Sequence, residues 1–371
     1  MLKSIPVIIL FLISLLSVFP APTYHTWLLA VGVTEYPWVF IIVTVIVLIL
    51  GLAFFNYPLL TTIIGICSLT LFLSPIIRAT MIASTMESEL RSTFGGKAPS
   101  FKPFSAFSML KAVDISDYKP IEYKKAGSKI LTFDFYKSKL AGKRPCVLVI
   151  HGGSWSSGDS KQLPELNSAL TEQGYHVAAL NYRKVPEYKH PAPVEDVKDA
   201  IEFLNGNSNE LQIDSENFIL LGRSAGGQIA LLAAYTLSDL KIKGVIDFYG
   251  PADMVWGYSI PSNPLVMDSR GVMENYLGGT YKEVAKNYES SSPIYFVGKK
   301  SPPTLMIHGD NDVLVSPKHS LKLRDKLQQN GVKNYLLQLP WAVHGFDYNL
   351  KGPGGQLSTY AVTYFIKTVI N

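Results

Sequence analysis

The distribution of apolar and polar positions divides the chain into two unequal parts. Up to about residue 78 most positions are apolar, and the apolar runs contain almost no charge. A bilayer is crossed by about 20 mostly apolar residues, and these runs lack the polar face that a helix on a soluble core would show. We therefore predict a membrane-spanning segment over residues 1–80, with about three transmembrane helices at about residues 5–20, 38–55 and 59–77.

A signal peptide is the alternative interpretation of the first apolar run, which is shorter than the other two. Pro20 and Pro22 follow this run and make a poor cleavage site, so we favour an uncleaved anchor. Lys3 favours a cytoplasmic N-terminus, which with three spans places the C-terminal domain outside, whereas Arg78 and Arg91 favour the opposite orientation. We expect a multi-pass membrane protein whose C-terminal domain faces the extracytoplasmic side.

Beyond the apolar segment, residues 81–124 are predicted as a linker, because Ala98 to Phe107 mixes Pro, Ser and Phe without a period. From about residue 125, apolar runs that predict strands alternate with stretches that predict helices. The expected strands are at 131–135, 145–150, 176–182, 218–221, 243–249, 304–308 and 335–339, and the expected helices at 162–173, 194–204, 228–234, 320–329 and 357–370. This alternation indicates an α/β domain over residues 125–371 with a doubly wound, mostly parallel sheet.

The apolar run that ends at Leu221 leads directly into Gly-x-Ser-x-Gly at residues 222–226, and a helical pattern of small residues follows. Between a strand and a helix this motif makes a sharp turn, which holds its central residue in a strained backbone conformation. Glycines on both sides avoid the clashes that side chains would cause. An ordinary tight turn is the alternative, but the strand–turn–helix context favours Ser224 as a nucleophile at a helix N-terminus.

A serine nucleophile needs a base that takes its proton and a carboxylate that orients the base. Two segments that follow predicted strands, and therefore lie at the same edge of the sheet, supply candidates. Residues 308–312 read His-Gly-Asp-Asn-Asp, and His344 follows the last strand. His344 is the candidate base, while Asp310 and Asp312 are both candidates for the acid, and either aspartate also suits an Asx-turn. We interpret His308, at the start of this turn, as a structural hydrogen-bonding residue.

The sequence His-Gly-Gly at residues 151–153 directly follows a predicted buried strand. Attack on an acyl carbon places negative charge on the former carbonyl oxygen, and losing one N–H group aimed at that oxygen costs about 3 kcal/mol. We expect the backbone N–H groups of Gly152, Gly153 and Ala225 to form such an oxyanion hole. A glycine turn without a catalytic part is the alternative, and His151 is interpreted as a residue that holds the loop.

Four motifs together resemble the esterase/lipase branch of the α/β-hydrolase superfamily, with hormone-sensitive-lipase-like and BD-FAE-like carboxylesterases as the nearest groups. The motifs are His-Gly-Gly-Ser-Trp, Gly-Arg-Ser-Ala-Gly-Gly, His-Gly-Asp-Asn-Asp-x-x-Val and His-Gly-Phe, beginning at residues 151, 222, 308 and 344. Their order, with Ser before Asp before His, is that of the α/β-hydrolase triad. The resemblance covers about residues 125–371. It implies the α/β-hydrolase fold and a catalytic triad of Ser224, Asp312 and His344, with Asp312 preferred over Asp310.

The resemblance also has consequences outside the triad. Tyr182, Arg183 and Asp196 fit positions that are structural in this superfamily. Two positions depart from the pattern, since Ser154 stands where many relatives have a third glycine and Arg223 replaces an acidic residue that is common before the serine. These departures place the chain nearer to arylformamidase-like, feruloyl-esterase-like and prenylcysteine-methylesterase-like relatives.

A small lid commonly lies between two late strands of this fold, which corresponds here to about residues 252–292. We expect Trp155 and, from the lid, Met254, Trp256 and Tyr258 to line a pocket for an apolar acyl or aryl group. The alternative for each lid residue is that it packs the lid onto the domain.

Composition excludes several functions. The net charge is +5 and the basic residues are scattered, so nucleic-acid binding has little support. Cys67 and Cys146 lie in apolar runs and are interpreted as core residues, and no zinc motif is present. We expect neither a metal nor a cofactor.

These observations predict a membrane-anchored serine hydrolase that cleaves small-molecule carboxylic esters through an acyl-enzyme intermediate. An amide or formamide hydrolase of the arylformamidase type would use the same triad. A catalytically silent scaffold or binding protein on the same fold is the third hypothesis. The sequence leaves the physiological substrate and the oligomeric state open.

Overall fold

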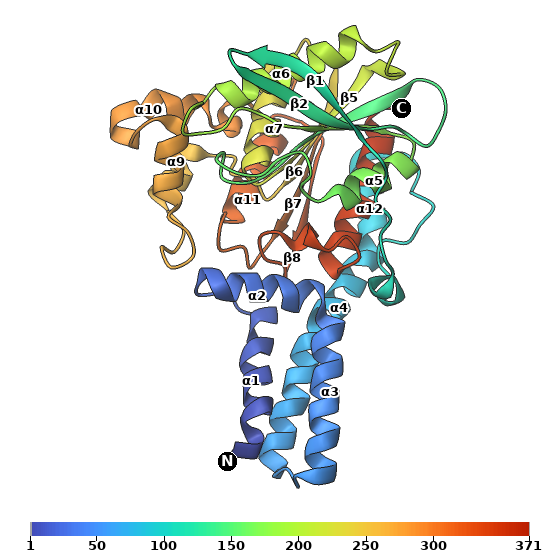
Figure 1. The fold of residues 1–371 in the computed structure, drawn as a ribbon, viewed down its shortest axis with the longest axis vertical. Helices are drawn as coiled ribbons and strands as arrows, with labels where there is room; N and C mark the ends of the chain where they lie inside the picture. The colour runs from blue at the N-terminus through green and yellow to red at the C-terminus, as the bar shows by residue number, and fades with distance from the viewer. Residues whose placement is uncertain (1, 371) are drawn as a thin grey trace.

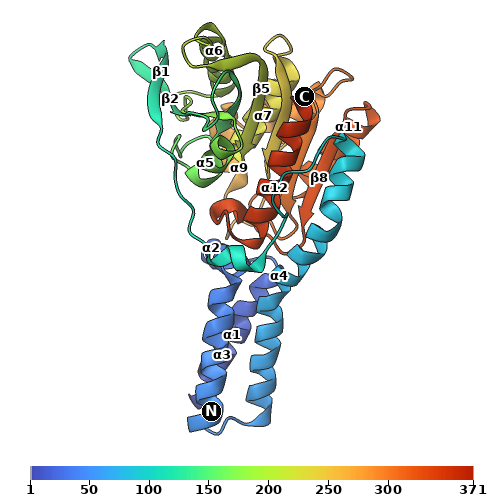
Figure 2. The same cartoon turned by 90° about the vertical axis from the view of Figure 1, so that its right-hand side faces the viewer.

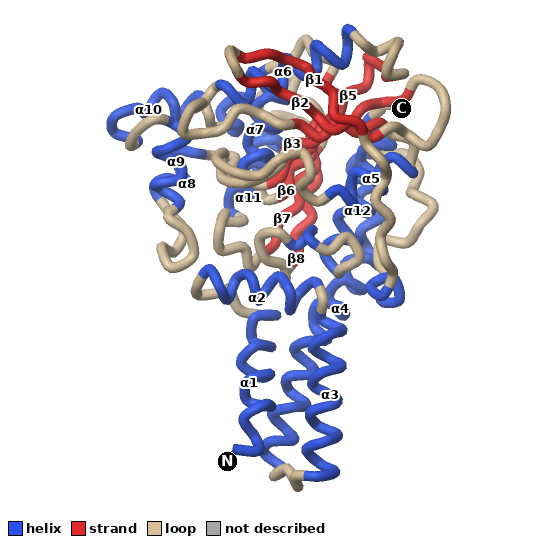
Figure 3. Tube along the Cα trace, viewed as in Figure 1, coloured by secondary structure: helices blue, strands red, loops and turns tan. Residues whose placement is uncertain are grey.

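The computed structural model describes residues 2–370 and places a mixed eight-stranded sheet at the centre of the C-terminal domain (Figures 1 and 3). The strand order is β1-β2-β4-β3-β5-β6-β7-β8. The strands are β1 (Lys119–Ala126), β2 (Lys129–Tyr136), β3 (Arg144–Ile150), β4 (His176–Leu180), β5 (Ile213–Arg223), β6 (Ile242–Phe248), β7 (Thr304–Gly309) and β8 (Asn334–Leu339). Pairing is antiparallel between β1, β2 and β4 and parallel from β4 to β8. The prediction of a doubly wound, mostly parallel sheet is confirmed, although β1 was not foreseen.

Helices cover both faces of the sheet (Figure 2). They are α5 (Pro164–Glu172), α6 (Ala192–Gly206), α7 (Ala225–Thr236), α11 (Lys318–Gln329) and α12 (Pro353–Val369). Successive side chains of a strand point to opposite faces, so Leu220 of β5 packs in the core beneath α6 and α7, whereas Ile219 and Leu221 pack beneath α5 and α12. Because β5 is buried on both faces, the strand that ends at Ser224 is held rigidly.

Three short helices occupy the region predicted as a lid, between β6 and β7. They are α8 (Met254–Ser259), α9 (Ser269–Leu277) and α10 (Tyr281–Ser290). Figure 1 shows them in orange beside the sheet. A loop over residues 260–268 joins α8 to α9 and forms part of the site described below.

The N-terminal segment forms a helical bundle that projects from the domain (Figures 1 and 2). It contains α1 (Ile5–Ser14), α3 (Pro37–Phe54) and the first part of α4 (Leu59–Phe94). Only α3 and α4, of the helices in the described chain, are long and apolar enough to cross a membrane. The first apolar run forms α1 and one 3-10 turn, together Ile5–Ser17, which is short of the expected third span because about 20 Å of helix does not cross a hydrocarbon core of about 30 Å. Helix α2 (Tyr24–Glu35), which was not predicted, follows α1 along the chain and lies across the domain end of the bundle.

The boundary at residue 80 between span and linker differs in the structure, because α4 continues without interruption to Phe94. Its last part packs on α12 through Ala79, Met86, Leu90 and Phe94, and the Phe94 and Phe365 rings meet edge to face at 5.1 Å. These apolar positions are seven, four and four residues apart, which places them on one face of the helix. The bundle and the domain therefore share a continuous helix.

Candidate active site

Ser224 lies at the sharp turn between β5 and α7, with backbone angles φ 53° and ψ −120°. Non-glycine residues rarely adopt such a conformation. A Cβ atom on Gly222 would lie 2.1 Å from the Gly226 carbonyl oxygen, and one on Gly226 would lie 2.2 Å from the carbonyl oxygen of Ile150. The two glycines of the motif therefore allow the close approach of β5, α7 and β3 that this turn requires.

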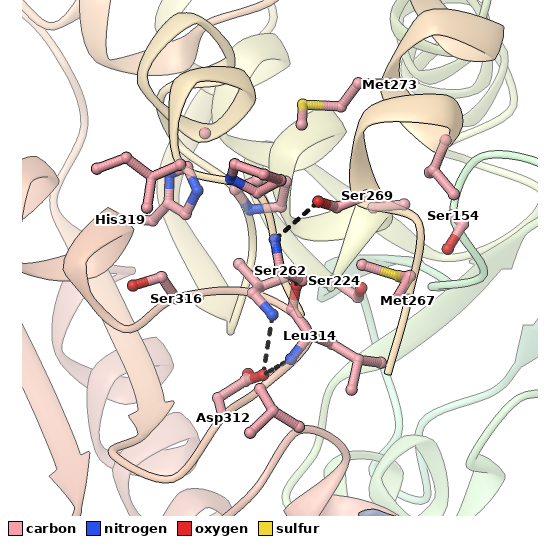
Figure 4. A pocket seen from close by; sticks show the side chains of 18 of the residues that line it. Ser154, Ser224, Ser262, Met267, Ser269, Met273, Asp312, Leu314, Ser316 and His319 are labelled. Atoms are coloured by element: carbon pink, nitrogen blue, oxygen red, sulfur yellow. Dashed lines mark hydrogen bonds between the residues drawn. The ribbon is translucent and has the colours of Figure 1, made fainter. Parts of the chain in front are cut away.

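His344 joins Ser224 to a buried carboxylate. Its Nε2 lies 3.0 Å from Ser224 Oγ, and its Nδ1 lies 2.7 Å from Asp312 Oδ2. The other carboxylate oxygen, Oδ1, accepts from the backbone N–H groups of Leu314 and Val315 at 2.9 Å (Figure 4). Burial raises the pKa of Asp312, but the attraction of His344 and hydrogen bonds from His308 and His344 outweigh it and hold the pKa well below its usual range. Asp312 is therefore ionised and oriented toward the imidazole.

The structure separates the two aspartates that the sequence left as alternatives. Asp310 is exposed, and its Oδ1 accepts a hydrogen bond from the side chain of Gln338. His308 is buried beneath the turn, where Nδ1 contacts Ser320 Oγ at 2.7 Å and Nε2 contacts the Val315 carbonyl oxygen at 3.0 Å. Asp312, and not Asp310, thus faces His344, while His308 holds the loop as the sequence predicted.

Of the expected oxyanion donors, Gly152 differs from the prediction. Its backbone N–H donates to the side-chain oxygen of Gln162 at 2.8 Å. The N–H groups of Gly153 and Ala225 have no hydrogen-bond partner within residues 2–370. Gly153 has φ 119°, a conformation that favours glycine. The two donors left for an oxyanion are those of Gly153 and Ala225, because a polar side chain ten residues further on already satisfies Gly152.

A cavity of about 270 Å³ opens beside Ser224 and Asp312 (Figure 4). Its apolar lining comes from Trp155, from the α8–α9 region and from the turn after Asp312. These apolar residues are Trp155, Ile260, Pro261, Met267, Val272, Met273, Val313, Leu314 and Val315. Polar side chains contribute mainly hydroxyl groups, from Ser154, Ser262, Ser269 and Ser316. The cavity suits a small apolar group next to the serine.

Three of the four predicted pocket residues do not line this cavity. Met254 is fully buried in the core, and Trp256 packs edge-on against His319 with ring centroids 4.8 Å apart. Tyr258 donates to Glu274 at 2.6 Å and packs on Tyr288. The segment predicted as a lid contributes to the lining, but Met254, Trp256 and Tyr258 do not, because α8 turns their side chains toward neighbouring helices. The loop after α8 supplies the lining instead, and its Ile260, Pro261 and Met267 carry no motif that would have identified them.

A buried ionic group lies beneath the triad and explains the unusual arginine before Ser224. Arg223 Nε pairs with Asp347, and the phenol of Tyr249 donates to the same carboxylate. Tyr249 also packs its ring against His344, with centroids 4.3 Å apart. Burial raises the pKa of Tyr249 well above its usual value, so it remains a donor. The group links the strand before the nucleophile to the loop that carries the base.

The N-terminal segment contacts the same loops. Trp27 Nε1 of α2 donates to the His344 carbonyl oxygen at 3.0 Å, and the contact is buried. Trp27 and Ala30 pack with Val343, and the side-chain amide of Asn311 donates to the Val18 carbonyl oxygen at 3.3 Å. Local sequence patterns contain no signal for these contacts, which join residues about 300 positions apart. The loops of the acid and the base are thus packed against α2.

Scaffold residues lie where the resemblance placed them. Arg183 Nε pairs with buried Asp196 at 2.8 Å, and the Tyr182 hydroxyl donates to the His151 carbonyl oxygen at 3.2 Å. His151 stacks on Tyr182 with centroids 4.3 Å apart, and burial lowers the pKa of His151 to about 4. Within residues 2–370 no group of three or more His, Cys, Asp or Glu side chains is placed to hold a metal ion.

Known proteins resemble this domain in sequence and in fold. Residues 133–327, more than half of the chain, match the BD-FAE family. The chain belongs to the BD-FAE family. The match ends before the segment that carries His344.

Similar proteins include the probable carboxylic ester hydrolase LipM of Mycobacterium tuberculosis, which is 28% identical over 56% of this chain and 51% of its own length. Esterase LipC of the same organism is 28% identical over 61% of this chain and 58% of its own length. Isoprenylcysteine alpha-carbonyl methylesterase ICME of Arabidopsis thaliana is 26% identical over 55% of this chain and 51% of its own length. The chain thus spans about half the length of the curated relatives it matches.

Among solved structures, an esterase from Pyrobaculum calidifontis superimposes with a TM-score of 0.61 at 20% identity, covering 79% of this chain and 93% of the other. At this identity the similarity concerns the fold. The domain has the α/β-hydrolase fold.

Proposed function

We propose that this protein is a serine hydrolase that cleaves carboxylic esters through an acyl-enzyme intermediate. One observation carries the proposal: a continuous chain of contacts runs from Ser224 Oγ through the His344 imidazole to the Asp312 carboxylate, at 3.0 Å and 2.7 Å. The cavity beside Ser224 and the esterase names of LipM and LipC support the same reaction.

In the proposed mechanism Ser224 Oγ attacks the ester carbonyl carbon while its proton passes to His344 Nε2. The N–H groups of Gly153 and Ala225 stabilise the resulting oxyanion. His344 then gives the proton to the leaving alcohol, and the acyl group remains on Ser224. Water attacks the acyl-enzyme with His344 taking its proton, which returns to Ser224 as the acid leaves. Asp312 holds Nδ1–H throughout and stabilises the imidazolium.

The test is hydrolysis of p-nitrophenyl butyrate by the full-length protein in detergent, with fluorophosphonate labelling of the same samples. Wild type should hydrolyse the ester and take up label, and Ser224→Ala should lose both. Ser316→Ala is the matched control, because Ser316 lines the same cavity and its hydroxyl bonds to the backbone N–H of Lys318. Equal labelling of wild type and Ser224→Ala would contradict the proposal. The remaining hypothesis would then be a catalytically silent scaffold or binding protein. Faster cleavage of the matched p-nitroanilide than of the ester would favour an amide hydrolase.

We further propose that α3 and α4 cross a bilayer as a multi-pass anchor, with α1 packed against both. Exposed apolar side chains along the bundle support it, including Ile46, Ile49 and Ile63, which are 50%, 60% and 47% exposed. Lys3 lies over the Phe55 ring at 5.9 Å, at the end of the bundle away from the domain, and favours a cytoplasmic position for that end. We expect protease digestion of sealed vesicles to find the hydrolase domain on the extracytoplasmic side; a cytoplasmic domain would show instead that Arg78 and Arg91 set the orientation.

A further inference from the structure

One wall of the cavity is tied directly to the N-terminal segment. The loop over residues 260–268 supplies Ile260, Pro261 and Met267 to the lining. The Tyr24 backbone N–H donates to the Leu265 carbonyl oxygen at 3.0 Å, and the Asn263 side chain donates to the Pro22 carbonyl oxygen at 3.2 Å. Figure 1 shows this loop reaching the N-terminal end of α2. The loop that lines this side of the cavity is therefore hydrogen-bonded to the start of α2.

Helix α2 marks one end of the bundle. Its Val33 packs with Leu10 of α1 and Phe72 of α4, and α3 begins at Pro37, two residues after α2 ends. The 18 residues of α3 span about 27 Å, close to the roughly 30 Å of a hydrocarbon core. Arg78, the first charged residue of α4, lies at the same end, beyond the 19 residues 59–77. If the bundle crosses a bilayer, α2 lies at its surface.

Apolar side chains are exposed on the two segments that this contact joins. Phe19, Tyr24 and Leu28 are 59%, 46% and 47% exposed, and across the loop Ile260 and Leu265 are 55% and 69% exposed. In water such a group of side chains is unfavourable, whereas at a bilayer surface apolar and aromatic side chains are stabilised. The cavity of about 270 Å³ is at the small end of the roughly 300–1,000 Å³ typical of pockets for drug-sized ligands. A substrate with a long chain would leave part of that chain outside the cavity. There it would lie against the exposed apolar side chains named above, which we call the rim.

We propose that the substrate is a membrane-resident amphiphilic ester, which enters from the adjacent leaflet between α2 and the loop over residues 260–268. Its ester group reaches Ser224 at the level of the lipid head groups, while the rest of its apolar chain stays in the bilayer. The inference rests on the proposed function and adds to it the class and the source of the substrate. A water-soluble ester would have no use for an apolar rim at the bilayer surface.

The experiment uses the full-length protein reconstituted in phosphatidylcholine vesicles and two esters of the same chromogenic alcohol. p-Nitrophenyl butyrate is offered in the water phase and p-nitrophenyl palmitate within the vesicles. The variant carries Leu28→Gln and Leu265→Gln, two rim residues that do not line the cavity. The matched control is Ile130→Gln, an apolar residue 51% exposed in the β1–β2 hairpin, which lies at the end of the domain away from the bundle in Figure 2.

We expect the rim variant to hydrolyse the vesicle-borne palmitate about tenfold more slowly than wild type, because it loses apolar area at the entrance. Its butyrate hydrolysis and fluorophosphonate labelling should stay at the wild-type level, and the control should change neither rate. Equal loss on both esters, no loss on either, or wild type that cleaves butyrate but not palmitate would overturn the inference while the hydrolase proposal stands. Absence of Ser224-dependent labelling and hydrolysis would instead overturn the proposed function, and this inference with it.

Discussion

The site has two sides that are held in place by different interactions. One side consists of the loops at the carboxyl ends of β3, β5, β7 and β8, and the other consists of segments inserted between strands. The first side, which we call the sheet wall, carries Ser224, Asp312, His344 and the loop at residues 151–155, each of which follows a parallel strand of the sheet. The second, the inserted wall, comprises residues 257–273 and rests on α2. The sheet wall thus carries the proposed catalytic side chains on loops between parallel strands, whereas the inserted wall consists of segments that pair with no strand.

The largest effect is expected on the sheet wall, from the carboxylate that orients the base. Asp312→Asn should lower kcat by about 10⁴-fold, because the amide no longer holds the required imidazole tautomer or stabilises the imidazolium. Steady-state kinetics with p-nitrophenyl butyrate measure this. Asp310→Asn, two residues away and exposed, is the control and should keep nearly full activity. If Asp310→Asn lowered kcat more than Asp312→Asn, the carboxylate that orients the base would be Asp310 and not Asp312.

The next effect concerns the loop after β3. Gly153→Ala should lower kcat by about 100-fold, since losing one oxyanion donor has effects of that order. A Cβ atom there would lie 2.3 Å from the Ser157 carbonyl oxygen and would displace the loop. Gly298→Ala is the control, because a Cβ atom at Gly298 meets nothing within 4 Å. If Gly153→Ala kept wild-type kcat, the oxyanion would have to use other donors.

A smaller effect tests whether α2 supports the sheet wall. Trp27→Phe keeps an aromatic ring but removes the donor to the His344 carbonyl oxygen. We expect kcat to fall about fivefold with KM unchanged, since a hydrogen bond contributes about 1 kcal/mol. Trp38→Phe is the control, because Trp38 Nε1 has no hydrogen-bond partner within the described residues. A fall in thermal stability without a change in kcat would assign Trp27 a purely structural role.

The smallest effect concerns two buried histidines near the cavity and is measured by pH. Burial lowers the pKa of His151, in the loop after β3, to about 4 and that of His319, in α11, to about 3. The unfolded chain binds these protons more tightly, with a pKa near 6.5, so the contribution to stability is complete above about pH 6.5 and is lost as pH falls toward 4. Melting temperatures should therefore drop between pH 7 and pH 5. The drop should be shallower in His319→Gln than in the control His25→Gln, which changes an exposed residue of α2.

The difference between the walls also explains which site residues could be predicted. Ser224 lies in a motif whose glycines are required within three residues of it, and the structure places Asp312 and His344 directly after strands that the apolar runs predict. Met254, Trp256 and Tyr258 were chosen by segment and residue type alone. Their direction depends on how α8 packs against α10 and α11, which no short pattern records.

The sequence by itself determined the alternation of strands and helices from β2 onward, the turn at Ser224 and the apolar character of the N-terminal segment. Those features depend on neighbouring residues, because strands repeat every two positions and helices about every 3.6. Only the tertiary structure decided that Gln162 occupies the Gly152 N–H, that α4 runs on into the domain, and that Trp27 contacts the His344 loop 317 residues later. Such contacts are set by the packing of whole helices and strands. The local sequence around each residue contains no pattern that predicts a contact with a residue far away along the chain.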